Sequence, residues 1–142
     1  MMVTEFAPCG SLADCIEKRP EPEERVKVKL MLDGAKGLEY LHANGVLHRD
    51  IKPDFVHVLV FSLAEELSVN GKLTDFGSSR NINMLMTGMT FTKGVGSPTY
   101  KAPEVLDKAK YKKPADVFSF GVMLFECFKW GDVYPKSVFK YP

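Results

Sequence analysis

The residues of this sequence that could do chemistry lie in two short stretches near its middle. Residues 48–54 carry Asp50 and Lys52 two positions apart, and Asp75 begins the second stretch, residues 75–77. A carboxylate can orient a hydroxyl group and accept its proton, and carboxylate oxygens suit a hard cation such as magnesium. A lysine can neutralise negative charge that develops on a transferred phosphate. Phosphoryl transfer asks a protein for this kind of positioning and charge neutralisation more than for covalent work.

Helical patterns flank these stretches and could position them. Apolar residues at helical spacing predict a helix over about residues 23–43, which Asn44 and Gly45 end. A second helix is predicted from Pro114, which suits a first turn, to about Lys129. Its apolar residues cover all sides, so we expect it to be buried as the central post of the domain.

Strands are predicted between the helices and at the N-terminus. Residues 58–61 have the pattern of a buried strand, and Asn70-Gly71 predicts a hairpin over residues 67–74. Residues 1–7 have the pattern of a short strand, followed by a helix that Ser11 caps and that runs to about Lys18. Residues 78–99 have no sustained periodicity and predict a long, mobile loop.

Composition narrows the class of protein. The 142 residues suffice for one domain, and the formal net charge of +1 indicates neither a nucleic-acid partner nor a basic membrane-binding surface. The longest apolar run, residues 117–128, is too short to span a bilayer, so we expect no membrane segment. The three cysteines do not form zinc-ligand pairs, which indicates reduced thiols in an intracellular, cytoplasmic protein.

Three motifs in a fixed order carry a family resemblance. The strings HRDIKPD at residues 48–54, DFG at 75–77 and APE at 102–104 resemble the catalytic loop, metal-binding triplet and activation-segment end of protein kinases. Lys52 followed by Pro53 resembles the serine/threonine type, and we expect the tyrosine-kinase-like group. The resemblance implies an α+β fold: the mainly α-helical C-terminal lobe with a small β hairpin, and an N-terminal lobe largely absent. Residues 1–142 would form a partial kinase domain, with a hinge strand (1–10), a C-lobe portion (11–142) and an activation segment (75–104).

The resemblance assigns roles in catalysis. Asp50 would accept the substrate hydroxyl's proton, Lys52 would neutralise the transferred phosphate, and Asp75 would bind magnesium. Phe76 would pack against His48 and hold the two motifs in register. Asp116, in the first turn of the last helix, should be buried and bonded to the backbone of His48 and Arg49.

The resemblance also implies ATP and Mg²⁺ as cofactors and a protein as substrate or docking partner. Backbone groups of Glu5 and Ala7 would meet the adenine edge, Thr4 would be the gatekeeper, Asp14 would lie near the ribose and Leu59 under the adenine.

Regulatory and substrate-facing positions follow from the same resemblance. Arg49 and Arg80 beside the loop threonines Thr90 and Thr92 resemble a phosphothreonine pocket. Ser97 would lie in the substrate-facing turn. In the family the residue at Glu104 pairs with an arginine from later helices, and its partner here stays open.

One segment departs from the family pattern. The family places a metal-binding asparagine five residues after the catalytic aspartate, and this position holds Phe55. Alternatively, Phe55-Val56 is an insertion and His57 occupies the asparagine's place, although a neutral imidazole is a poor magnesium ligand. Either alignment damages the second metal site.

Three functional hypotheses remain. The chain is a serine/threonine kinase domain that transfers the γ-phosphate of ATP to protein Ser/Thr, a pseudokinase-type binding module, or a truncated product without function. It contains no glycine-rich phosphate loop and begins at the hinge. We therefore expect the isolated chain to be incomplete and inactive alone.

Overall fold

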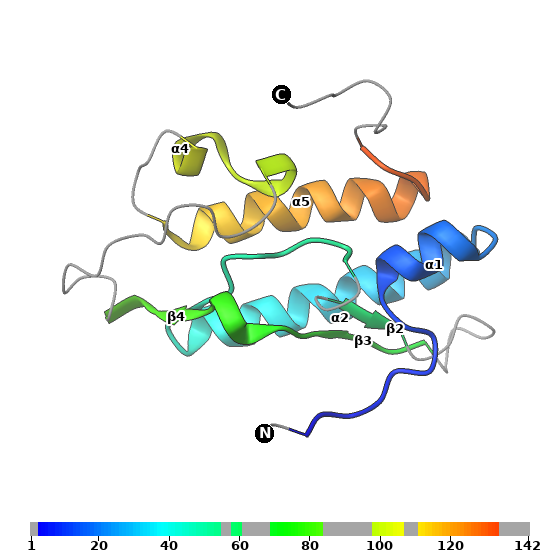
Figure 1. Ribbon diagram of the computed structural model, residues 1–142, viewed down its shortest axis with the longest axis horizontal. Helices are drawn as coiled ribbons and strands as arrows, with labels where there is room; N and C mark the ends of the chain where they lie inside the picture. The colour runs from blue at the N-terminus through cyan, green and yellow to red at the C-terminus, as the bar shows by residue number, and fades with distance from the viewer. Residues whose placement is uncertain (1–2, 55–57, 61–68, 84–97, 107–110, 134–142) are drawn as a thin grey trace.

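The computed structural model describes residues 3–54, 58–60, 69–83, 98–106 and 111–133 (Figure 1). This part of the chain is mainly helical and carries two small antiparallel sheets, which confirms the expected fold class. The helices are α1 (Leu12–Lys18), α2 (Glu24–Ala43), α4 (Pro103–Leu106) and α5 (Lys113–Lys129). The strands are β1 (Val46–Leu47), β2 (Val58–Val60), β3 (Gly71–Leu73) and β4 (Arg80–Asn81), and short 3-10 turns cover Phe76–Ser78 and Pro98–Tyr100.

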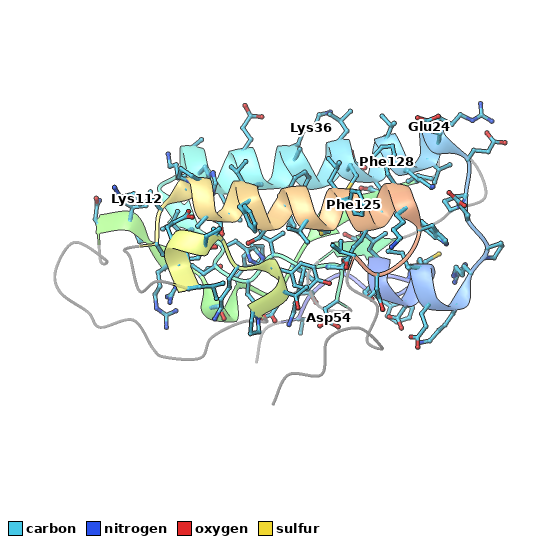
Figure 2. The ribbon with its side chains drawn as sticks, turned by 90° about the horizontal axis from the view of Figure 1, so that it is seen from above. Glu24, Lys36, Asp54, Lys112, Phe125 and Phe128 are labelled. Atoms are coloured by element: carbon cyan, nitrogen blue, oxygen red, sulfur yellow. The ribbon has the colours of Figure 1, made fainter. Side chains whose placement is uncertain are left out.

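Helices α2 and α5 lie side by side and form the centre of the fold (Figures 1 and 2). Leu30 and Leu38 of α2 belong to one buried cluster with Met123 and Cys127 of α5. The same cluster includes Leu12 of α1 and Ile51 of the loop between β1 and β2. The predicted helices are therefore confirmed, and their shared core fixes the loop that carries Asp50.

The α5 helix is not buried on all sides, so the prediction of a central post is wrong in this respect. Val117 is 56% exposed and Phe125 is 55% exposed, whereas Ala115, Ser119 and Met123 are buried. The buried positions form a helical stripe, because only one face of the helix is covered by the described residues. An apolar composition permits burial, but neighbouring elements must supply it. No helix in the described part of the chain is long and apolar enough to cross a membrane.

The hairpin exists, but with different arms from those predicted. Strand β2 pairs with β3 in antiparallel register, with Val58 opposite Leu73 and Val60 opposite Gly71. Gly71 therefore lies in a strand, and Asn70-Gly71 does not form the turn. A Cβ on Gly71 would lie 3.2 Å from the Leu30 carbonyl oxygen of α2. The glycine permits this close approach of strand and helix, which accounts for its presence better than a turn does.

One loop prediction and one strand prediction also need correction. Residues 80 and 81, predicted as loop, form β4 and pair with β1, with Leu47 opposite Arg80. Conversely, residues 3–7 form no strand, and Val3 and Phe6 are more than four-fifths exposed. An extended segment becomes a strand only when another backbone pairs with it, and none of the described strands pairs with residues 3–7.

Candidate functional site

A single buried carboxylate organises the candidate catalytic loop. Asp116 is fully buried at the start of α5. Its Oδ2 atom accepts hydrogen bonds from the His48 backbone N–H at 2.8 Å and from His42 Nε2 at 2.9 Å. Its Oδ1 atom accepts from the Arg49 backbone N–H at 2.9 Å and from the Tyr111 hydroxyl at 2.7 Å. The predicted bonds to His48 and Arg49 are therefore present, together with two others.

His42 and Tyr111 were not predicted to belong to this network. Neither residue belongs to the three motifs, so the sequence carries no signal for either of them. A buried carboxylate, however, can accept about four hydrogen bonds, and two backbone groups supply only half of them. The two unfilled acceptor positions of Asp116 were thus a reason to expect two further hydrogen-bond donors near it.

His48 joins the loop to the segment that carries Asp75. Its Nε2 lies 3.0 Å from the Thr74 carbonyl oxygen, and its Nδ1 accepts from the Asp50 backbone N–H at 3.3 Å. A carbonyl only accepts and an amide N–H only donates, so this arrangement requires a neutral ring with its proton on Nε2. The ring also meets Phe76 edge to face, with centroids 5.7 Å apart. The predicted contact between His48 and Phe76 is present.

Asp50 and Lys52 lie together at the end of this loop. Lys52 Nζ is 3.9 Å from Asp50 Oδ2 and 3.3 Å from Asp54 Oδ2. The Asp50 and Lys52 side chains are 16% and 19% exposed, so water can reach both. The Pro53 carbonyl accepts a hydrogen bond from the Ala13 backbone N–H, which ties the loop to the start of α1.

A cleft of about 570 Å³ opens beside Lys52. The loop supplies Lys52 and Asp54 to its lining, residues 99 and 100 supply a second wall, and Trp130 at the end of α5 lines it as well. Tyr100 is fixed to α5, because its hydroxyl donates to Glu126 at 2.9 Å and its carbonyl accepts from the Ser119 hydroxyl at 2.6 Å. Burial raises the pKa of Glu126. The cleft thus lies between the candidate catalytic loop and residues 99–100, which come shortly before Ala102-Pro103-Glu104.

Asp75 is exposed and has a left-handed backbone, with φ of 58°. Its Oδ1 accepts from the Gly77 backbone N–H at 3.2 Å. Among the described residues no group of three or more His, Cys, Asp or Glu side chains could hold a metal ion. Magnesium is commonly held by one or two carboxylates with substrate phosphates and water. The exposed carboxylate of Asp75 is thus suited to be one protein ligand of a magnesium ion, and it does not form a metal cage by itself.

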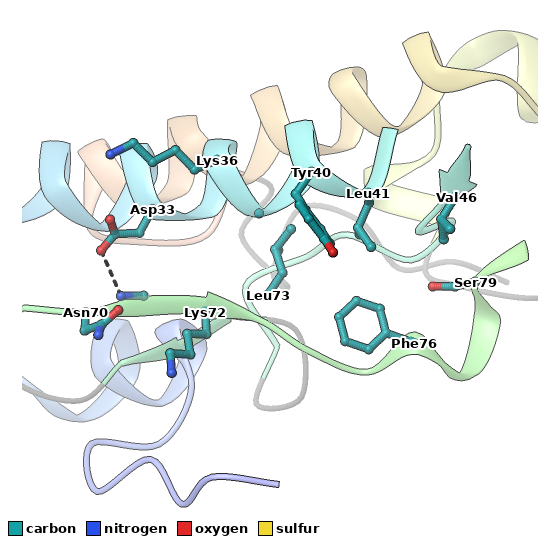
Figure 3. Close-up of a pocket in the computed structure, with 12 residues that line it drawn as sticks. Asp33, Lys36, Tyr40, Leu41, Val46, Asn70, Lys72, Leu73, Phe76 and Ser79 are labelled. Atoms are coloured by element: carbon teal, nitrogen blue, oxygen red, sulfur yellow. Dashed lines mark hydrogen bonds between the residues drawn. The ribbon is translucent and has the colours of Figure 1, made fainter. Parts of the chain in front are cut away.

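An apolar pocket of about 630 Å³ lies on the other side of this segment (Figure 3). Phe76, Leu73 and Tyr40 line it, with Asp33 and Lys72 among its polar residues. Asp33 accepts a hydrogen bond from the Gly71 backbone N–H at 3.1 Å, which fixes β3 to α2. Phe76 therefore faces this pocket while its ring edge also contacts His48.

The expected nucleotide-binding residues are only partly brought together. Thr4 and Glu5 are exposed and Ala7 is half-buried. Glu5 forms an ion pair with Lys72, which is the register partner of Leu59. The N-terminal segment therefore lies beside the hairpin, as an adenine site between them would require.

Asp14 has a structural use that sequence reasoning missed. Its carboxylate accepts from the Ser11 hydroxyl at 2.9 Å and backbone at 3.2 Å, and Ser11 in turn accepts from the Asp14 N–H at 3.0 Å. This capping box starts α1. The Ser11-x-x-Asp14 spacing was a signal that could have revealed it.

We expect Asp14→Asn to lower the free energy of unfolding at pH 7 by about 1 kcal/mol. Hydrogen bonds from the Lys18 side chain and from Ser11 lower the pKa of Asp14 from 3.8 to about 2. Since the folded-state pKa lies below the ordinary value, this stabilisation is complete above about pH 4 and is lost as the pH falls toward 2. Urea unfolding of parent and variant between pH 2 and 7 measures it. A difference that is independent of pH would contradict the assignment.

Arg49 and Arg80 carry the cations of the expected phosphate pocket. Arg49 is buried with a φ of 72°, and burial together with the neighbouring charge of Arg80 lowers its pKa. Arg80 is exposed on β4, and Glu104 is exposed on α4. Four other candidate residues lie outside the described residues: His57, Thr90, Thr92 and Ser97.

Comparison with known proteins identifies the family. The sequence matches the protein kinase domain over residues 1–138. It is 32% identical over 154 residues to the probable serine/threonine-protein kinase gdt9 of Dictyostelium discoideum, covering 88% of this chain and 10% of that protein. It is 42% identical over 127 residues to the probable serine/threonine-protein kinase gdt8 of the same organism, covering 88% of this chain and 9% of that protein. It is 37% identical over 126 residues to the serine/threonine-protein kinase shk2 of Schizosaccharomyces pombe, covering 88% of this chain and 20% of that protein.

These relatives are much longer than the chain, which spans between 9% and 20% of the three. The comparisons do not assign the tyrosine-kinase-like group, which stays a prediction. The match to the kinase domain covers nearly the whole chain. This protein therefore belongs to the protein kinase domain family, and its relatives are serine/threonine-protein kinases.

Proposed function

We propose that this chain provides the catalytic loop of a kinase that transfers the γ-phosphate of ATP to serine or threonine residues of proteins. The observation that carries the proposal is the loop held by Asp116. Four hydrogen bonds to one buried carboxylate fix the residues before Asp50, and Lys52, whose Nζ lies 3.9 Å from Asp50 Oδ2, lines a cleft. Positioning of this kind is the main protein contribution to phosphoryl transfer.

Each residue has a specific part in this proposal. Asp50 orients the substrate hydroxyl and accepts its proton, and Lys52 offsets the charge that develops on the transferred group. Asp75, with its exposed carboxylate, would be a protein ligand for Mg²⁺, which would supply positive charge to offset that of the phosphates. His48 keeps Asp50 and Asp75 in register through its two ring nitrogens and Phe76.

Nucleotide binding is assigned to the N-terminal segment and the hairpin. The ion pair between Glu5 and Lys72 supports an adenine site between these segments, with Ala7 contributing a backbone group and Leu59 an apolar surface. Thr4 would control the depth of this site. Asp14 would contact the ribose, and to do so its carboxylate would have to leave the capping box.

Regulation and substrate contact are assigned to the activation segment, residues 75–104. A phosphate on Thr90 or Thr92 would place negative charge beside Arg49 and Arg80, two cations that otherwise repel each other. Ser97 would contact the substrate backbone, and Glu104 would pair with a cation from outside α4. A protein that uses ATP and carries three free cysteines is expected to work inside the cell.

A second candidate function is a docking module without transfer activity. Two observations favour it: Phe55 stands where the family has a metal-binding asparagine, and Lys52 lies closer to Asp54 than to Asp50. In such a protein the cleft beside Lys52 would bind a protein segment without phosphorylating it.

The test of the proposed function is Mg²⁺-dependent incorporation of phosphate into Ser/Thr peptides, with the N-terminal lobe of a relative fused before residue 1. We expect Asp50→Asn to lower the rate of transfer roughly a thousandfold, because it removes the proton acceptor. Glu39→Gln, the same chemical change at an exposed position of α2, is the matched control and should leave the rate unchanged. Equal rates in parent and Asp50→Asn would favour the docking module.

A further inference from the structure

The three cysteines of the chain belong to or border one buried cluster. Cys15 of α1 and Cys127 of α5 are fully buried members of the cluster that joins these helices, and the half-buried Cys9 packs against the same cluster. None of the three forms a disulfide. Thiols that are kept reduced and lie close together can form a transient, redox-sensing disulfide.

Cys9 and Cys15 have the spacing that a disulfide needs. The Cys15 thiol donates a hydrogen bond to the Cys9 carbonyl oxygen, with 3.5 Å between sulfur and oxygen. The Cα atoms of a disulfide pair are usually about 4.4–6.8 Å apart, and this contact is compatible with that spacing. Because the two cysteines are close in sequence, closing the loop between them also costs little chain entropy.

The backbone around these two cysteines is well fixed. Gly10 has φ of 75°, and its N–H donates to the Ala7 carbonyl at 3.1 Å, which closes the turn that carries Cys9. The capping box described above starts α1 directly after this turn. Both thiols are therefore held on ordered backbone, and proximity of this kind accelerates a reaction between them.

The three thiols differ in their access to solvent. Cys15 is fully buried, and burial raises its pKa to about 11, so it carries its proton at pH 7. Burial likewise raises the pKa of the Cys127 thiol to about 12. Peroxides react with accessible thiolates, and among the three cysteines Cys9 is the one that solvent reaches. Oxidation would therefore begin at Cys9.

We infer that Cys9 and Cys15 form a dithiol site that hydrogen peroxide oxidises to a disulfide. The Cys9 sulfur attacks one peroxide oxygen, the O–O bond breaks, and the other oxygen leaves as water with the Cys9 proton. The Cys15 sulfur then attacks the Cys9 sulfenic acid, an S–S bond forms, and the hydroxyl leaves with the Cys15 proton as a second water. Each sulfur gives up one electron, and the two electrons reduce the peroxide.

This disulfide would act on the contact between α1 and the candidate catalytic loop. The ring that it closes, residues 9–15, contains Ala13, whose N–H donates to the Pro53 carbonyl of that loop. The redox state of the two thiols would thus reach the segment that carries Lys52.

Peptide mapping of the oxidised chain tests the inference. The 142-residue chain is treated with hydrogen peroxide, remaining thiols are blocked with iodoacetamide, and the chain is cut with trypsin. Trypsin separates residues 1–18, which carry Cys9 and Cys15, from residues 113–129, which carry Cys127. We expect the first peptide to lose two hydrogens and to take up no iodoacetamide, while Cys127 is fully alkylated. Dithiothreitol should restore both thiols of the first peptide.

Three variants separate the roles of the cysteines. In Cys15→Ala we expect the Cys9 sulfenic acid to persist, so that dimedone traps it. In Cys9→Ala we expect Cys15 to be oxidised at least about tenfold more slowly than Cys9 is in the parent, because Cys15 is buried. Cys127→Ala is the matched control from the same cluster and should form the disulfide at the parent's rate. If this control fails to fold, alkylation of Cys127 in the parent's peptide map still decides whether it takes part.

Three results would overturn the inference. One is full alkylation of both cysteines in residues 1–18 after peroxide treatment. Another is a disulfide that links residues 1–18 to residues 113–129, which would make Cys127 the partner. The third is equal trapping of Cys9 by dimedone in the parent and in Cys15→Ala, since Cys15 would then not react with the sulfenic acid. No phosphate transfer is measured, so this inference and the proposed kinase reaction can fail separately.

Discussion

Asp116→Ala is expected to lower the free energy of unfolding by about 4 kcal/mol, a large part of the stability of a domain of this size. The substitution removes the acceptor of four hydrogen bonds at a fully buried position. The N–H groups of His48 and Arg49 would then be buried without partners, and each such group costs about 1–3 kcal/mol. The left-handed conformation of Arg49 would lose its main support as well.

Urea unfolding followed by circular dichroism measures this effect. Glu39→Ala, which removes an exposed carboxylate from α2, should change stability by less than about 0.5 kcal/mol. Asp116→Asn is informative because it keeps the shape but replaces one acceptor oxygen with a donor. We expect it to be destabilised nearly as much as Asp116→Ala, since its amide NH₂ would face two donors. An Asp116→Ala chain with the parent's unfolding midpoint would show that these bonds contribute little.

The long helices could be predicted because their signals are local. Apolar spacing located α2 and α5, and Asn44-Gly45 marked the end of α2, where Gly45 has φ of 70°. The motif order located Asp50 and Asp75, and the burial of Asp116 and its bonds to His48 and Arg49 were predicted because it lies in the first turn of an apolar helix. Each of these predictions depends on residue type and spacing alone.

The remaining features depend on contacts between distant segments. His42 reaches Asp116 across 74 positions, and β1 and β4 are only two residues long, which is too short for any periodic pattern. The exposed face of α5 could not be predicted either, because an apolar helix does not reveal which of its sides has a neighbour. The left-handed conformation of Trp130, which ends α5, could not be predicted, because glycine is the residue that usually adopts it.

Repair of the segment after the catalytic loop is expected to produce the largest change in activity. The departure from the family pattern lies at Phe55, Val56 and His57, directly after the loop that Asp116 fixes. Deletion of Phe55 and Val56 together with His57→Asn would restore a carbonyl oxygen ligand at the position of the second metal. Oxygen ligands suit Mg²⁺ and a neutral imidazole does not. In the chain fused to a relative's N-terminal lobe, we expect the rate of phosphate transfer to rise on the order of a hundredfold.

The matched control carries the same deletion with His57→Ala, so the two chains differ only in the amide group at that position. Each is measured against its own Asp50→Asn blank over a range of Mg²⁺ concentrations. If the second metal limits the rate, the asparagine chain should be faster and should reach its full rate at a lower Mg²⁺ concentration. Equal rates in the asparagine and alanine chains would mean that loop length, and not the ligand, limits transfer.

Without the added lobe we expect no transfer above the blank from any of these chains, because residues 1–142 contain no glycine-rich loop to hold the phosphates. Transfer by the unmodified chain alone would show that the Asp50 loop and Asp75 suffice to position ATP, and would contradict the need for both the lobe and the second metal ligand.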